Sequence, residues 1–188
     1  MIHGGTAFAA AVQNGHLDVV KYLGDSGADT GIPIHDGATP IFIACYRGNR
    51  EIVECVLCRQ LKSPRRLCDG GPPPPSPPPL ARVPATARTR YLISKKVKLE
   101  TPNNNGNTPM SIACQHRRLD IAELLLEQGV SMQPVNKKGS TPFFFACQEG
   151  NLDVVKFLAR NGVDTTHGKN GISPFHMACY RGHLDVVT

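Results

Sequence analysis

The stretch TPFFFACQEGNLDVVKFLA, from Thr141 to Ala159, contains the signals for a complete pair of helices. Thr141 followed by Pro142 is typical of a helix start, because a threonine hydroxyl caps free amides and proline lacks only a donor that the first turn leaves unused. Gly150 lies where the helix must end and the chain must turn back. Asp153 then falls in the first turn of a second apolar-faced segment, where the helix dipole favours an acid. The stretch therefore predicts a helix, a turn and a second helix.

Comparable blocks recur along the 188 residues, with their first residues at Thr6, Thr39, Thr108, Thr141 and Ser173. Three of the four intervals are 32 or 33 residues long, and the interval after Thr39 is 69 residues long. One such helix pair cannot bury its own apolar face, but neighbours stacked at a fixed period can bury it against one another. The pattern predicts an all-α solenoid of four to five units, with hairpin-like turns between them.

These blocks resemble the ankyrin repeat family, whose helix–loop–helix units of about 33 residues carry the signature T-P-L-H-x-A. Only His176 occupies the signature histidine position, Arg50 replaces an apolar residue, and Arg117 replaces the turn glycine. A left-handed conformation at Arg117 would cost about 1 kcal/mol. Neither end shows a polar capping repeat, so we expect a piece of a longer array with an exposed apolar C-terminal face.

The long interval contains a segment of a different composition. Residues 55–90 hold the run GGPPPPSPPP and seven basic residues against one acid, which accounts for the whole net charge of +6. Removing these 36 residues restores the 33-residue spacing, so the predicted organisation is repeats 1 and 2 in residues 1–54, a disordered proline- and arginine-rich insert in 55–90, and the rest of repeat 2 with repeats 3–5 in 91–188.

The insert interrupts a helix, which is the wrong place for a linker or a loop insertion, so our hypothesis is translated non-coding sequence. If the segment is present, either Cys55–Leu57 or Tyr91–Ile93 could complete the interrupted helix. We favour a helix through Cys55–Leu57 with the prolines in solvent. A proline-rich ligand and a nucleic-acid-binding segment are weaker alternatives, because the prolines lack a suitably spaced arginine and no aromatic residues alternate with the basic ones.

Catalysis, metal binding and membrane insertion are not favoured. Four cysteines, Cys45, Cys114, Cys147 and Cys179, occupy one equivalent position about a repeat apart, whereas zinc ligands come in pairs a few residues apart. We interpret them as small core residues. No phosphate-binding loop, catalytic pair or membrane-length apolar run is present, so we expect no enzyme activity, no cofactor and no small-molecule substrate. The seven cysteines are odd in number and their placement argues against a disulfide framework, so we expect a reducing compartment, the cytoplasm or else the nucleus.

The exposed surface of the repeats remains available to bind a partner. In the ankyrin family, partners are usually bound by the turn tips and by the exposed ends of the first helices, which line a concave groove. This resemblance implies a non-catalytic scaffold that binds another protein; the alternative is a recruitment module of a larger enzyme or channel. The candidate partner-binding residues are Asp36, Tyr46, Arg47, Asn107, Gln115, His116, Lys137, Lys138, Gln148, Glu149, Tyr180 and Arg181.

Overall fold

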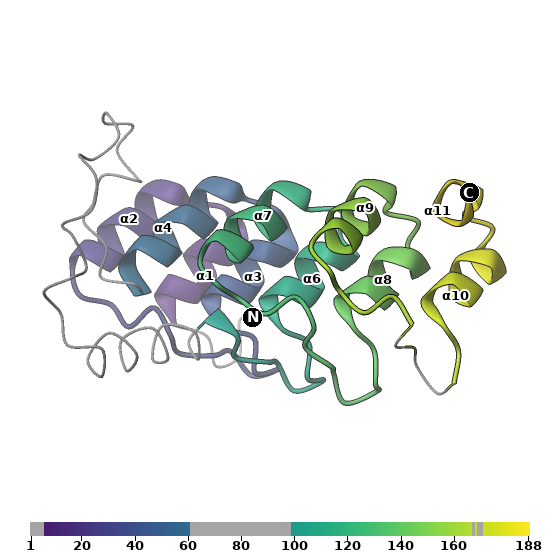
Figure 1. The fold of residues 1–188 in the computed structure, drawn as a ribbon. Coiled ribbons are helices and arrows are strands. Elements are labelled where there is room, and N and C mark those ends of the chain that lie inside the picture. Colours follow the sequence, from purple (N-terminus) through teal and green to yellow (C-terminus); the bar gives the residue numbers. More distant parts are fainter. Residues whose placement is uncertain (1–5, 61–98, 167, 169–170) are drawn as a thin grey trace, which may run out of the picture.

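The computed structural model describes residues 6–60, 99–166, 168 and 171–188. Their regular elements are helices that alternate between two rows (Figure 1), with the first helix of each repeat in one row and the second helix in the other. The helices are α1 Ala7–Asn14, α2 Leu17–Asp25, α3 Pro40–Arg47, α4 Arg50–Gln60, α6 Pro109–Gln115, α7 Leu119–Glu127, α8 Pro142–Gln148, α9 Leu152–Arg160, α10 Pro174–Arg181 and α11 Leu184–Val187.

Each helix packs against the equivalent helix of the neighbouring repeat. The first helices make one continuous row of contacts from α1 through α3, α6 and α8 to α10, and the second helices make the other row. α3 contacts α6 directly, although 69 residues separate Thr39 from Thr108. The predicted solenoid is confirmed, and the long interval does not interrupt it.

The capping residues act as the sequence indicates. The side chains of Thr6, Thr108, Thr141 and Ser173 each accept a hydrogen bond from the backbone amide three residues ahead. Thr39 begins α3 without such a bond, and its hydroxyl is buried without a partner among the described residues.

Burial along the stack shows which face of each repeat meets its neighbour. The apolar residue two positions after the capping residue is fully buried at Ile41, Met110 and Phe143, but Phe175 in the last repeat is 40% exposed. Among the second helices, the outermost two expose apolar side chains: Val19 in α2 is 45% exposed, and Val187 in α11 is 44% exposed. The side chains equivalent to these two in the inner repeats are buried, so neighbouring repeats supply the missing half of each core.

A polar contact also joins successive repeats. The residue that follows the inter-helix turn reaches back to a carbonyl near the end of the preceding first helix: Arg118 Nη2 to Arg47 O at 3.3 Å, Asn151 Nδ2 to Gln115 O at 3.0 Å, and His183 Nε2 to Gln148 O at 3.0 Å. These bonds satisfy carbonyls that a helix leaves free at its C-terminus. His176, at the signature histidine position, has an exposed side chain, and in this repeat His183 makes the contact.

Arg117 adopts the left-handed conformation expected from its place in the repeat, with a φ of 60°. Among the described residues it is the only non-glycine residue with a positive φ. Its side chain donates from Nε to Asn151 Oδ1 and from Nη2 to the carbonyls of Glu149 and Gly150, both at 3.3 Å. The arginine therefore has contacts that glycine could not make, and these offset its backbone strain.

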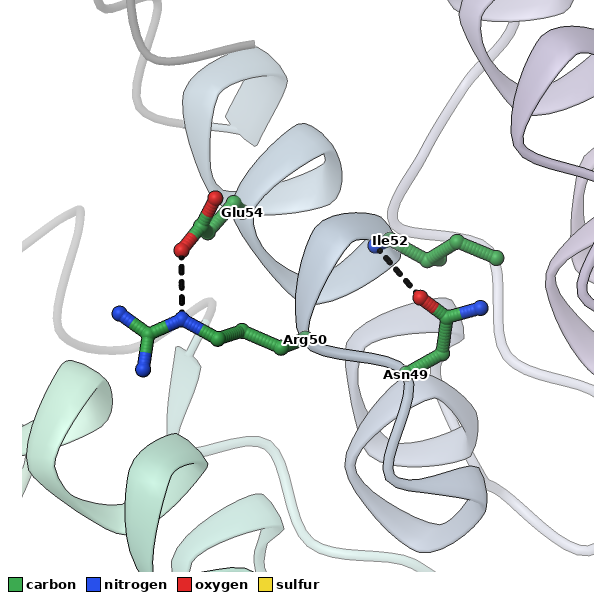
Figure 2. Close-up of polar contacts among 4 residues, drawn as sticks. All are labelled: Asn49, Arg50, Ile52 and Glu54. Atoms are coloured by element: carbon green, nitrogen blue, oxygen red, sulfur yellow. Dashed lines mark hydrogen bonds and ion pairs between the residues drawn. The ribbon is translucent and has the colours of Figure 1, made fainter. Parts of the chain in front are cut away.

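The helix next to the insert runs further than the predicted boundary at Glu54. Asn49 caps α4, because its Oδ1 accepts a hydrogen bond from Ile52 N (Figure 2). Arg50, which stands where the family has an apolar residue, forms an exposed ion pair with Glu54 at 2.9 Å. Cys55, Val56 and Leu57 are buried within α4, as in the arrangement that we favoured. Residues 55–60 are helical, in contrast to the disorder expected from position 55; residues 61–98 lie outside the described residues.

Three of the four equivalent cysteines are core residues. Cys45, Cys114 and Cys147 have no exposed surface, and burial raises the pKa of Cys114 and of Cys147 to about 12. Burial also raises the pKa of the Cys45 thiol, and the adjacent Cys114 adds to this. Cys179 differs from the expectation because it is exposed: no further described helix pair packs against α10.

The contacts of Arg117 predict an order of stability. Arg117→Ala keeps the left-handed strain of about 1 kcal/mol and loses the hydrogen bonds, whereas Arg117→Gly loses the bonds but also the strain. We expect the free energy of unfolding to fall from the unmodified chain to Arg117→Gly and again to Arg117→Ala, with the two variants about 1 kcal/mol apart. Urea denaturation followed by circular dichroism measures both steps. A glycine variant more stable than the unmodified chain would contradict a stabilising role for the side chain.

The burial of the thiols predicts their reactivity. Cys68 lies outside the described residues, so the test uses a Cys68→Ser background. At pH 8 we expect the disulfide reagent DTNB to modify Cys179 rapidly in the native protein, because attack requires an accessible thiolate. Cys45, Cys114 and Cys147 should react only after unfolding in guanidinium chloride. Adding Cys179→Ser provides the control and should abolish the fast phase; rapid native-state labelling of the three buried thiols would show that their packing is wrong.

Candidate functional site

A groove of about 350 Å³ lies on the face formed by the first helices and the turn tips. Its floor is apolar, and polar groups stand at its edges. Two turns between repeats contribute one wall, and α3 with single residues of α1 and α6 contributes the other. The residues that line this concave groove are Gln13, Ile34, Asp36, Ala38, Phe42, Ile43, Tyr46, Arg47, Asn103 and Ile112.

The turn tips are held rigidly by side-chain and backbone hydrogen bonds. Asp36 Oδ1 accepts from Ala38 N at 2.9 Å, and Asn103 Oδ1 accepts from the amide of Asn105 at 3.0 Å. Such bonds from an Asp or Asn side chain to the backbone two residues ahead fix a tight turn. Neighbouring tips are also joined to each other, because Asn104 N donates to Asp36 O at 2.9 Å. The groove therefore has a preformed wall.

The opposite edge contains an aromatic pair from two repeats. The rings of Tyr46 and His116 meet edge to face, with their centroids 4.8 Å apart. Burial lowers the pKa of His116, and the Arg118 guanidinium acts in the same direction, while Glu149 opposes them. The imidazole is therefore neutral at pH 7 and supports Tyr46 by packing. The tyrosine keeps 48% of its surface exposed.

The groove gathers only part of the predicted residue set. It brings together Asp36, Tyr46 and Arg47, and His116 lies against Tyr46. Seven of the twelve predicted residues are exposed: Asp36, Tyr46, Arg47, Lys137, Lys138, Tyr180 and Arg181. The other five are half-buried: Asn107, Gln115, His116, Gln148 and Glu149.

Several of the predicted residues lie outside the groove. Tyr180 and Arg181 lie at the end of α10, three repeats beyond the equivalent Tyr46 and Arg47 of α3. The side chain of Asn107 is used within the scaffold, since its Oδ1 accepts from Asn136 Nδ2 at 2.8 Å. Gln148 Nε2 donates to Oε1 of its neighbour Glu149 at 2.8 Å, and this pair lies at the end of α8.

The apolar floor was missed by sequence reasoning, which looked for polar and aromatic surface residues. It includes Phe42, Ile43 and Ile112, each 6% exposed, and also Ile34. Ile43 and Ile112 both stand four positions after the capping threonine, so an apolar residue recurring at this position is the signal that could have revealed the floor.

The described residues contain no group of three or more His, Cys, Asp or Glu side chains placed to hold a metal ion. Nor does any described helix have the length and apolar character needed to cross a bilayer; α4, the longest, has 11 residues.

Comparison with known proteins agrees with this architecture. A family model for ankyrin repeats, in three copies, matches residues 2–66, 83–134 and 128–188. The phosphocholine transferase AnkX of Legionella pneumophila is 30% identical over 127 residues, which make up 65% of this chain but only 13% of that protein. Ankyrin repeats generally act as protein–protein interaction modules and are typically not catalytic. The chain belongs to the ankyrin repeat family.

Proposed function

We propose that the chain is a non-catalytic binding module that holds a partner protein against its concave face. The observation that carries this proposal is the concave groove, where an apolar floor lies between Asp36 at one edge and Tyr46 with Arg47 at the other. Buried apolar centres surrounded by polar rims are the usual anatomy of protein interfaces.

Tyr46 has the properties of a strong contact residue. Tyrosine and arginine are enriched among the interface residues that contribute most binding energy. The ring is half-exposed and already held against His116, so little conformational freedom is lost when a partner covers it. Arg47 is exposed beside it, at the end of α3. We propose that this pair contributes most of the binding energy at its edge of the groove.

A recruitment module of a larger enzyme is the second candidate. The comparison with AnkX favours it, because the matched repeats are 13% of a protein whose name describes a phosphocholine transferase. In that case the repeats would bring a protein to a catalytic domain outside this chain. The contact surface proposed above would be the same. Nucleic acid is not favoured as the partner, because residues 55–90 contribute the whole net charge of +6 and the rest of the chain is electrically balanced.

Photocrosslinking tests which face meets the partner. A benzophenone amino acid at Tyr46 should form discrete protein adducts in an extract of cells that express the chain. The matched control is Tyr22 on α2, which is 71% exposed in the other row of helices. Adducts at Tyr22 and none at Tyr46 would refute concave-face binding, and nucleic-acid adducts at Tyr46 would refute a protein partner.

Alanine substitution then measures the contribution of the ring. With a partner identified by the crosslink, Tyr46→Ala should weaken binding by about 2 kcal/mol, the usual threshold for a hot-spot residue, in a calorimetric titration. Tyr22→Ala should leave the affinity unchanged. Because Tyr46 is half-exposed, its loss should leave the helical circular dichroism signal intact, which separates a lost contact from a lost fold.

A further inference from the structure

We propose that the concave groove binds an extended segment of the partner in which an apolar side chain lies between a basic residue directed at Asp36 and an acidic residue directed at Arg47. This inference rests on the proposed function and specifies the chemistry of the partner. It follows from the position, burial and charge of the residues that line the groove.

The floor requires an apolar side chain. Phe42, Ile43 and Ile112 keep a small exposed fraction each, and this surface faces the groove. Contact with an aliphatic side chain removes the remaining apolar surface from water, whereas a polar side chain would lose its hydrogen bonds to water there. The volume of about 350 Å³ accommodates side chains of a peptide and not a folded element. Small-molecule pockets have polar groups that converge on the ligand, but here the charges stand at separate edges.

Asp36 defines the acidic edge. It is exposed at the turn tip, and its position is fixed because its carbonyl accepts from Asn104 N and its Oδ1 from Ala38 N. A carboxylate has acceptor capacity beyond one such bond. A lysine or arginine of the partner can therefore bind this edge without any rearrangement of the turn.

Arg47 defines the basic edge. Its side chain is exposed, and the ion pair on the neighbouring helix α4 joins Arg50 to Glu54 and does not involve it. The backbone of Arg47 is held in place, because its carbonyl accepts from Arg118 Nη2 at 3.3 Å. An exposed guanidinium that projects from this fixed backbone, next to an apolar floor, favours a carboxylate, which it can bind through two parallel hydrogen bonds.

The length of α3 gives an approximate spacing for the two edges. Asp36 lies in the turn before this eight-residue helix and Arg47 ends it, so we take the rise of the helix, about 12 Å, as the separation that a peptide must span. An extended peptide advances about 3.3 Å per residue, so its two charged residues should be about four positions apart. Alternate residues of an extended chain point to the same side, which places the apolar residue midway between them on the face that meets the groove. The expected pattern is basic-x-apolar-x-acidic.

Synthetic peptides test this pattern with the full chain. The probes are Lys-Thr-Leu-Thr-Glu, Lys-Thr-Leu-Thr-Lys and Glu-Thr-Leu-Thr-Glu, each acetylated and amidated, titrated into protein labelled at its isoleucine methyl groups. In NMR spectra, Ile43 and Ile112 should shift, while Ile52 and Ile121, buried in the second helices, should not. The first peptide should bind about two- to fivefold more tightly than either of the others, the range of one exposed ion pair.

Variants of the chain assign each charge. Arg47→Glu should reverse the preference so that the Lys/Lys peptide binds best. Asp36→Asn keeps the oxygen that accepts from Ala38 N, and it should remove the advantage of the Lys/Glu peptide over the Glu/Glu peptide. Arg160→Glu, which reverses an exposed charge at the end of α9 in the other row of helices and outside the groove, is the matched control and should leave all three affinities unchanged.

Two results would overturn the proposal: no shift at the groove isoleucines with any peptide, or equal affinities for all three. The crosslinking experiment is independent of the peptide titration. If Tyr46 forms protein adducts but the peptides fail, the basic-x-apolar-x-acidic pattern is wrong and the proposed binding at the concave face still holds.

Discussion

The structure depends on the burial of one repeat's apolar face against the next. A pair of helices as short as α8 and α9 has a core only on the sides where a neighbour stands, and the residues that face a neighbour are the ones with no exposed surface. Met110 and Phe143 are buried in this way, whereas the equivalent Phe175 is not. Stability in such an array is approximately a sum over repeats and their interfaces, so the residues that carry it are those between repeats.

This arrangement divides the chemistry of the chain into two groups of residues. The buried position six residues after each capping residue takes a small side chain, and cysteine serves there as a hydrophobe with a raised pKa at Cys45 and Cys114. Exposed side chains at the ends of the first helices carry fewer packing demands. Tyr46 and Arg47 belong to this second group, so changes there would alter the surface offered to the partner that we propose and leave the buried faces of the repeats intact.

Local features of the fold could be predicted from the sequence because each repeat uses short-range signals. Threonine caps, first-turn prolines and the positive φ at Arg117 follow from position within the period. Contacts across repeats could not be predicted in the same way. The pairing of Tyr46 with His116 joins residues 70 positions apart, and its geometry depends on how closely α3 and α6 approach. The sequence also left two segments able to complete α4, since both are apolar; burial of Val56 and Leu57 shows that the first one does.

The polar bonds between repeats are unevenly distributed along the stack. Arg117 and Asn151 link the α6/α7 pair to the α8/α9 pair through both side chains and backbone carbonyls, and Asn151 is almost fully buried where it does so. Coupling of this kind makes two adjacent repeats open as one cooperative unit. Slow amide hydrogen exchange should therefore extend across α6 and α8 together, and the middle of the array should act as the foldon on which the outer helix pairs assemble.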